Sequence, residues 1–180
     1  MKAVIPERMT VDRPEGVVVF LIGMRINRWW KIHKWLPVMF AMPRMLRELR
    51  ANPRSGYLGG SLLPGMSVQY WSSLEALLAY AADRKGEHFP AWASFYKKIG
   101  TGGDVGIWHE TYMVPAGGFE AVYVNVPPTG LGRFAPLVSA RGQRARARTR
   151  LAAAPQGTPL PAPAEASENA DTPHALAAAR

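Results

Sequence analysis

The chain has 180 residues, is 48% hydrophobic and carries a formal net charge of +9, which suits one domain with a sizeable core. It contains no cysteine, so disulfides, a thiolate nucleophile and cysteine-bound metal sites are excluded. No apolar run approaches the ~20 residues that span a bilayer, and the N-terminal sequence lacks the apolar core of a signal peptide. We therefore expect a cytoplasmic protein without a membrane partner.

Two prolines, Pro6 and Pro14, oppose regular structure in residues 1–15, which are predicted to form an N-terminal arm. The following run, residues 17–26, is almost continuously apolar, as in a strand that is buried on both faces. Gly23 interrupts this run and indicates either a bulge or the close approach of another group.

Residues 27–52 have the pattern of a helix. Pro37 suits a first helical position, and Pro43 predicts a kink farther along. The segment before Pro37 is unusually aromatic and includes Trp30. The apolar side chains from Val38 onward recur at helical spacing: Val38, Met42, Met45, Leu46 and Leu49.

Two short strands, 57–63 and 67–71, are predicted to form a hairpin joined by a Pro-Gly turn. A helix follows, with Ser72 or Ser73 as its N-cap. A second helical piece is predicted over residues 90–99, where four apolar and aromatic side chains share one side.

Residues 105–125 contain two alternating runs around a Pro-Ala-Gly-Gly turn and are predicted to form a further hairpin. The first run places an indole, an imidazole, a carboxylate and a phenol close together: Trp108, His109, Glu110, Thr111 and Tyr112. Such side chains on a rigid strand are expected to line any pocket of the protein. Gly106 is predicted to introduce a bulge into this run.

Neighbouring residues of a strand face opposite sides, so His109 and Glu110 are not expected to contact each other. Glu110 is expected to pair with Arg25 of the first strand. His109 and His88 are both candidates for a general base, and the helix start beside His88 would lower its pKa. The alternative for His109 is a structural histidine, and for His88 a histidine in a surface loop. The sequence has no histidine pair at i, i+4 and no carboxylate cluster at the spacing of metal ligands.

The order strand, helix, hairpin, two-piece helix, strand predicts an α+β fold over residues 16–133, a ferredoxin-like sandwich with an antiparallel sheet. Helices would cover one face of the sheet. The other face carries apolar residues, and a homodimer in which two sheets meet face to face would bury them.

Residues 134–180 are rich in alanine and proline and are predicted to form a disordered tail. Five arginines of this tail fall within residues 141–150. Such a run can bind nucleic acid, but no aromatic residue interleaves it and no nucleic-acid motif accompanies it. A solvated basic segment is therefore preferred, and nucleic acid is not an expected partner.

Six segments in order resemble a bacterial and fungal family described as a monooxygenase like that of the fumagillin pathway, formerly a domain of unknown function. The family is similar to the antibiotic biosynthesis monooxygenases, and the resemblance covers about residues 7–133. The segments are Ile22–Asn27, His33–Pro37, Met42–Met45, Gln69–Trp71, His88–Trp92 and Val105–Tyr112. The resemblance implies a ferredoxin-like fold and a dimeric α/β barrel, and it transfers no catalytic residue.

Relatives in the wider superfamily include cofactor-independent oxygenases of polycyclic phenols and several haem enzymes. The function expected first is therefore a monooxygenase acting with oxygen on a hydrophobic aromatic or polyketide-like molecule, without a cofactor. One alternative is a haem enzyme with His88 or His109 as the ligand, and another is a non-enzymatic protein that binds a hydrophobic ligand. The candidate catalytic residues are His109, His88, Tyr112 and Arg25. The candidate substrate-binding residues are Trp71, Trp92, Trp108 and Trp30.

Overall fold

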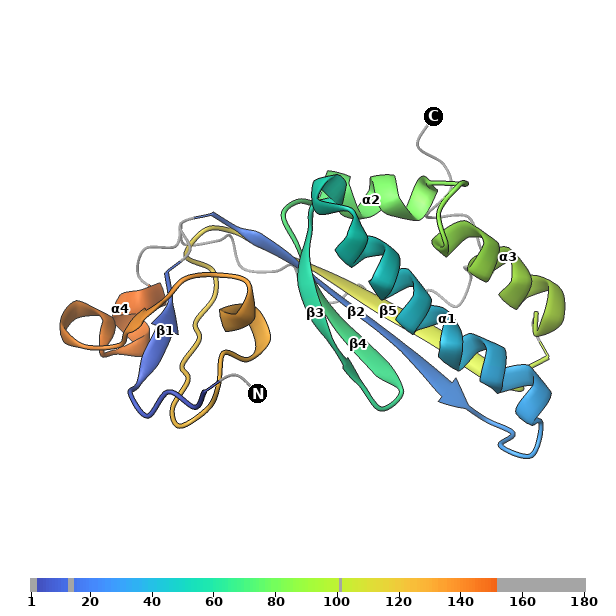
Figure 1. Ribbon diagram of the computed structural model, residues 1–180, viewed down its shortest axis with the longest axis horizontal. Helices are drawn as coiled ribbons and strands as arrows, with labels where there is room; N and C mark the ends of the chain where they lie inside the picture. The colour runs from blue at the N-terminus through green and yellow to red at the C-terminus, as the bar shows by residue number, and fades with distance from the viewer. Residues whose placement is uncertain (1–2, 13–14, 101, 152–180) are drawn as a thin grey trace, which may run out of the picture.

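The computed structural model describes residues 3–12, 15–100 and 102–151, and it forms an α+β ferredoxin-like sandwich, as predicted (Figure 1). Four antiparallel strands form one open sheet in the order β3-β4-β2-β5. These strands are β2 (Val17–Ile26), β3 (Tyr57–Leu63), β4 (Met66–Trp71) and β5 (Val105–Val114). The main helices are α1 (Ile32–Ala51), α2 (Leu74–Ala82) and α3 (His88–Lys98).

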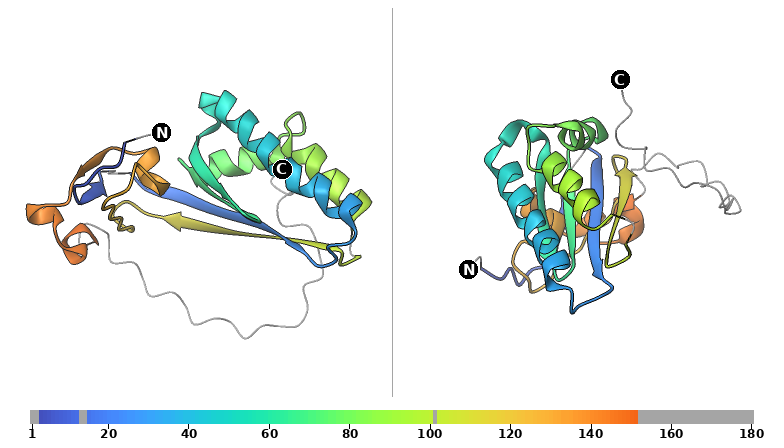
Figure 2. Two further views of the ribbon diagram at one scale, coloured as in Figure 1. Left: turned by 60° about the horizontal axis from the view of Figure 1, so that its bottom comes forward. Right: turned by 90° about the vertical axis from the view of Figure 1, so that its right-hand side faces the viewer.

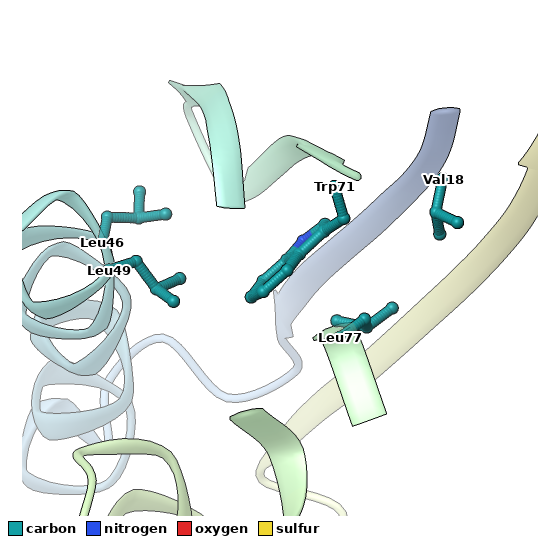
Figure 3. Packing of buried hydrophobic residues seen from close by; sticks show 5 residues of the cluster. All are labelled: Val18, Leu46, Leu49, Trp71 and Leu77. Carbon is teal, nitrogen blue, oxygen red and sulfur yellow. The ribbon is translucent and has the colours of Figure 1, made fainter. Parts of the chain in front are cut away.

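The three helices lie on one face of the sheet, which we call the helix face, and the opposite side is the open face (Figure 2). The core between the sheet and the helices centres on Trp71, whose side chain is fully buried. Figure 3 shows its apolar neighbours, which come from β2, α1 and α2: Val18, Leu46, Leu49 and Leu77. The buried Trp71 Nε1 donates a hydrogen bond to Gln69 Oε1 at 3.2 Å, so the indole has its polar group satisfied.

Helix α1 begins at Ile32, five residues before Pro37, so the predicted first helical position of Pro37 is wrong. Both Pro37 and Pro43 lie inside the helix, where each removes one backbone donor. Packing of the predicted apolar face against the sheet compensates for these losses, since Leu46 and Leu49 are almost completely buried.

The hairpin of β3 and β4 is confirmed, and so is the capped helix after it. The side chain of Ser73 accepts a hydrogen bond from the backbone N–H of Ala76 at 3.2 Å, which makes Ser73 the N-cap of α2. The second helical piece begins at His88, two residues earlier than predicted. His88 therefore occupies a helix start instead of a loop.

Strand β5 pairs with β2 in continuous register from Val17 opposite Val114 to Ile26 opposite Val105, so the bulge predicted at Gly106 is wrong. Gly23 instead marks a close approach. A methyl group placed on Gly23 would lie 2.5 Å from the indole ring of Trp108, the residue opposite it.

The predicted hairpin of residues 105–125 is wrong in its second half, because residues 119–126 form no strand beside β5. This run instead joins the N-terminal arm through two isolated bridges, Val126 to Ile5 and Tyr123 to Met9. The Tyr123 hydroxyl also accepts a hydrogen bond from the backbone N–H of Gly132 at 3.0 Å. The alternation was a correct sign of extended backbone, but the partner lies far away in the sequence.

A second small sheet joins the predicted arm to the predicted tail. Strand β1 (Met9–Val11) pairs with β6 (Leu137–Ser139), which follows the 3-10 helix η2 (Gly130–Arg133). The 3-10 helices η1 (Pro53–Ser55) and η3 (Gly142–Arg144) and helix α4 (Ala147–Leu151) complete the described elements. The prediction of a disordered tail is therefore wrong for residues 134–151. The rest of the predicted tail, residues 152–180, lies outside the described part of the chain.

Three of the five arginines within residues 141–150 form ion pairs with acidic residues of distant segments. Ion pairs join Arg144 to Asp12, Arg141 to Glu7 and Arg150 to Glu120. Solvated guanidinium groups were expected here, whereas these three arginines pair with the arm and with the segment after β5, in addition to the pairing of β1 with β6. No helix in the described ranges is long and apolar enough to cross a bilayer.

Replacement of Leu46 by alanine is expected to lower the free energy of unfolding by about 2–5 kcal/mol, because it opens a cavity beside Trp71. The matched control is Leu78→Ala on α2, where the leucine side chain is 40% exposed and the loss is expected to stay below about 1 kcal/mol. Urea denaturation of both variants measures the difference. Equal losses would contradict the assignment of the core.

Candidate functional site

The register of β5 against β2 divides the predicted site residues between the two faces of the sheet. His109 lies opposite Ile22, in the same set of positions as Val18, and therefore on the helix face. Trp108 and Tyr112 lie on the open face. The predicted run from Trp108 to Tyr112 consequently does not line a single pocket.

The two candidate histidines both lie on the helix side of the sheet, His109 on β5 and His88 at the start of α3. The ring of His109 lies 5.6 Å from that of Phe20, and the ring of His88 lies 5.8 Å from that of Tyr80. An electrostatic interaction with His109 is the smallest of the causes that act on the pKa of His88, and burial is the largest. The two imidazoles are separated by 21 residues of sequence and belong to one region of the fold.

His88 is held by a backbone contact that determines its tautomer. Its Nδ1 lies 3.1 Å from the carbonyl oxygen of Ala81, so a proton on Nδ1 completes a hydrogen bond. The lone pair then resides on Nε2, for which no hydrogen bond is found within the described ranges. Burial lowers the pKa of His88, although the Ala81 carbonyl and the Glu48 carboxylate oppose this effect. A neutral imidazole with a free Nε2 is the form that a general base requires.

Sequence reasoning missed Glu48 and Tyr80, which hold this region in place. The Tyr80 hydroxyl donates a hydrogen bond to Glu48 Oε2 at 3.1 Å. The backbone N–H of Glu87 donates to both Glu48 oxygens, at 3.1 and 3.0 Å. Burial and the Glu48 charge raise the pKa of Tyr80, so its hydroxyl keeps its proton. Glu48 thereby ties α1 to the residue that precedes His88. The available signal was a carboxylate between Leu46 and Leu49 on the buried side of the helix.

The other two candidate catalytic residues, Tyr112 and Arg25, lie on the open face, so the sheet separates them from the histidines. The Tyr112 hydroxyl donates to Glu110 Oε2 at 2.6 Å, and this bond raises the pKa of Tyr112. Glu110 lies opposite Leu21, whereas Arg25 lies four positions farther along β2, opposite Gly106. The predicted pair of Arg25 and Glu110 is therefore wrong, and the phenol of Tyr112 takes the place of the guanidinium.

The four candidate tryptophans occupy four different environments. Trp71 is fully buried in the core, and Trp108 covers Gly23 on the open face. Trp92 lies on α3 with its ring 4.9 Å from that of Tyr96. Trp30, in the segment before α1, is 61% exposed and meets Trp29 edge to face. These indoles therefore do not form the walls of one cavity.

A hollow of about 280 Å³ lies elsewhere, at the outer edge of the sheet. It is lined by the last turn of α1, Pro53, residues 57–60 of β3, Arg133 at the end of η2 and Phe134 directly after it. None of the eight candidate residues contributes to it. Neither of the two histidines named as possible haem ligands, His88 and His109, lines this hollow. Within the described ranges no group of three His, Asp or Glu side chains forms a metal site.

The protonation of His88 should make the fold sensitive to acid. Because its pKa in the folded chain lies below the ordinary value of 6.5, the unfolded chain binds the proton more readily. Stability is therefore expected to fall as the pH drops below about 6.5, until the folded-state pKa is passed. The His88→Gln variant should show a smaller loss between pH 7 and pH 5 in urea denaturation. An NMR titration in which His88 protonates at or above pH 6.5 would contradict this prediction.

Comparison with known proteins identifies the family of this chain. No curated protein matches the chain. The family model described as Monooxygenase af470-like matches residues 17–131, which is well over half of the chain and spans the four-stranded sheet with its three helices. The chain therefore belongs to the Monooxygenase af470-like family.

Proposed function

We propose that the protein is a monooxygenase that oxidises a hydrophobic aromatic or polyketide-like molecule without a cofactor, with His88 as the general base. Membership in a family named for monooxygenases supports the reaction class. The observation that supports the role of His88 is its neutral imidazole, whose Nδ1 bonds to Ala81 while its Nε2 stays free. A closer relation to the fumagillin-pathway enzymes and to the antibiotic biosynthesis monooxygenases is part of the same proposal, as is location in the cytoplasm.

The reaction needs no external reductant when the substrate carries an acidic CH₂ group beside a phenolic ring system. Removal of a proton by Nε2 of His88 gives an electron-rich anion, which transfers electrons to O₂. The CH₂ group becomes a carbonyl group, one oxygen atom enters the product and the other leaves as water. The four electrons that O₂ accepts all come from the substrate, so atoms and electrons balance.

The substrate would lie along the helix face of β5, beside the two histidines. The helices leave this edge uncovered, since His109 and Thr111 are exposed and the side chain of Met113 is 68% exposed. Phe20 and Met113 supply apolar contacts, and His109 can donate a hydrogen bond to the developing anion. Tyr112 and Arg25, on the other face, are not used in this proposal.

We further propose that the open face is covered by a second copy of the chain, which would complete a dimeric α/β barrel. Strands β2 and β4 direct alternate apolar side chains to this face, among them Leu21 opposite Val68. Trp108 is 40% exposed and Tyr112 is 50% exposed there. Large apolar and aromatic side chains that are exposed on a sheet face are typical of a protein–protein interface.

The role of His88 is tested by oxygen uptake with anthrone, a tricyclic ketone whose CH₂ group is acidified by two aromatic rings. Loss of a general base typically costs about 10²–10⁴-fold in rate, so His88→Gln should lower kcat within that range. The control is His33→Gln on α1, which lies outside the proposed site and should retain the wild-type rate. Wild-type kcat in the His88→Gln protein would remove this histidine from the mechanism.

The dimer is tested by replacing Leu21 with glutamate, which places a charge in the proposed interface. Sedimentation velocity should show a dimer for the wild-type chain and a monomer for this variant. The matched control is Ile32→Glu at the start of α1, where the isoleucine is already 52% exposed on the other side of the sheet. A wild-type chain that sediments as a monomer at micromolar concentration would overturn the proposal.

A further inference from the structure

The hollow at the outer edge of β3, which we call the arginine hollow, has a chemistry that the proposed oxygenation does not use. It holds two guanidinium groups, Arg50 at the end of α1 and Arg133 at the end of η2. Both side chains are exposed, and within the described ranges neither of them takes part in an ion pair. Two unneutralised cations that face the same small volume repel each other unless an anion lies between them.

A buried polar atom lies beside the same two cations. The hydroxyl oxygen of Tyr57 is inaccessible to solvent, and it makes no hydrogen bond of good geometry to the described residues. Burial raises the pKa of Tyr57, and Arg50 opposes this increase through its charge and a loose side-chain hydrogen bond, as Arg133 does through its charge alone. A buried hydroxyl without a well-aligned hydrogen bond is costly, and a ligand oxygen in the hollow would accept the Tyr57 O–H.

Two glycines of β3 make the space in which these groups meet. Gly59 has a φ of 147°, and a methyl group on it would lie 2.1 Å from the ring of Phe134. A methyl group on Gly60 would lie 2.9 Å from the Tyr57 hydroxyl. The Phe134 ring in turn carries Arg133, whose guanidinium carbon lies 5.4 Å from the ring centroid. The hollow is therefore built from close contacts and is not a gap between loosely placed loops.

The end of α1 does not cancel the positive charge. Its terminal carbonyl groups act as about half of a negative elementary charge, whereas the two guanidinium groups bring two full positive charges. Arg50 lies in the last turn, where the carbonyl groups stabilise its positive charge. Their partial negative charge neutralises only a small part of the positive charge in the hollow. Leu49, Pro53 and Phe134 supply apolar walls beside the charged end.

We propose that the arginine hollow binds a small organic anion, with its carboxylate or phosphate group between Arg50 and Arg133 and its apolar part against Phe134. Guanidinium groups recognise both kinds of oxyanion through paired N–H donors, and the Tyr57 hydroxyl adds a neutral donor. The hollow lies at β3, and His109 lies on β5, at the opposite edge of the sheet. Three strand spacings, about 14 Å, separate the two edges. This site is therefore distinct from the one proposed for oxygenation and does not depend on it.

Isothermal titration calorimetry of the full-length chain tests the proposal with three probes of similar shape: phenylacetate, phenyl phosphate and the neutral phenylacetamide. At least one of the two anions is expected to bind, and phenylacetamide is not. Binding of phenyl phosphate alone would identify phosphate esters as the ligand class, and binding of phenylacetate alone would identify carboxylates. The proposal would be overturned if neither anion binds at a ligand concentration of about 10 mM. Binding of the neutral amide with the affinity of the anions would overturn it as well.

Variants assign the binding to the hollow. Arg50→Gln and Arg133→Gln should each weaken binding of the anion by about 10- to 100-fold, since each removes a charge-assisted hydrogen bond. Tyr57→Phe should weaken it less, because it removes only the hydroxyl group. The matched control is Arg47→Gln, an exposed arginine one turn earlier on α1 that does not line the hollow. Affinities of the Arg50 and Arg133 variants that equal that of the control would contradict the assignment. Circular dichroism confirms that each variant is folded.

Discussion

The ladder between β2 and β5 is the constraint on which the rest of the molecule depends. Because it runs without a bulge, the face of every side chain on β5 is determined by its partner on β2. His109 follows Ile22 to the helix face, and Trp108 follows Gly23 to the open face. Two chemically different surfaces therefore arise from consecutive residues. One carries imidazoles beside the helices, and the other carries an indole and a phenol suited to contact with another sheet.

The contact between Glu48 and the backbone N–H of Glu87 explains how the second histidine reaches this surface. His88 does not belong to the sheet, and its position depends on the short connection between α2 and α3. A single carboxylate on α1 accepts hydrogen bonds from Glu87 and from Tyr80, and it thereby fixes the connection from both sides. Glu48 therefore has a structural role, and its charge only partly offsets the lowering of the His88 pKa by burial.

The sequence was sufficient to predict the order of the elements from β2 to β5, the buried side of α1 and the close approach at Gly23. These features depend on local periodicity and on glycine, which can be recognised within a short window. The partner of residues 119–126 could not be predicted, because alternation indicates an extended backbone but does not say which edge it meets. The same holds for the arginines of residues 141–150. Their acidic partners are single residues in remote segments, and isolated ion pairs of this kind leave no pattern in the sequence. The two histidines were identified as candidates, whereas their separation from Tyr112 required the register of the sheet.

The pairing of β1 with β6 has a consequence for where this protein can be cut. Both strands lie outside residues 17–131, the range that defines the family, and each has the other as its partner. The Phe134 ring that covers Gly59 lies outside this range as well. An expression fragment limited to the family range would leave β3 uncovered on one side, and Tyr123 would lose its backbone partner Met9. The segments before and after the family domain pair with each other. The shortest fragment that keeps this pairing therefore extends from the arm to at least Ser139.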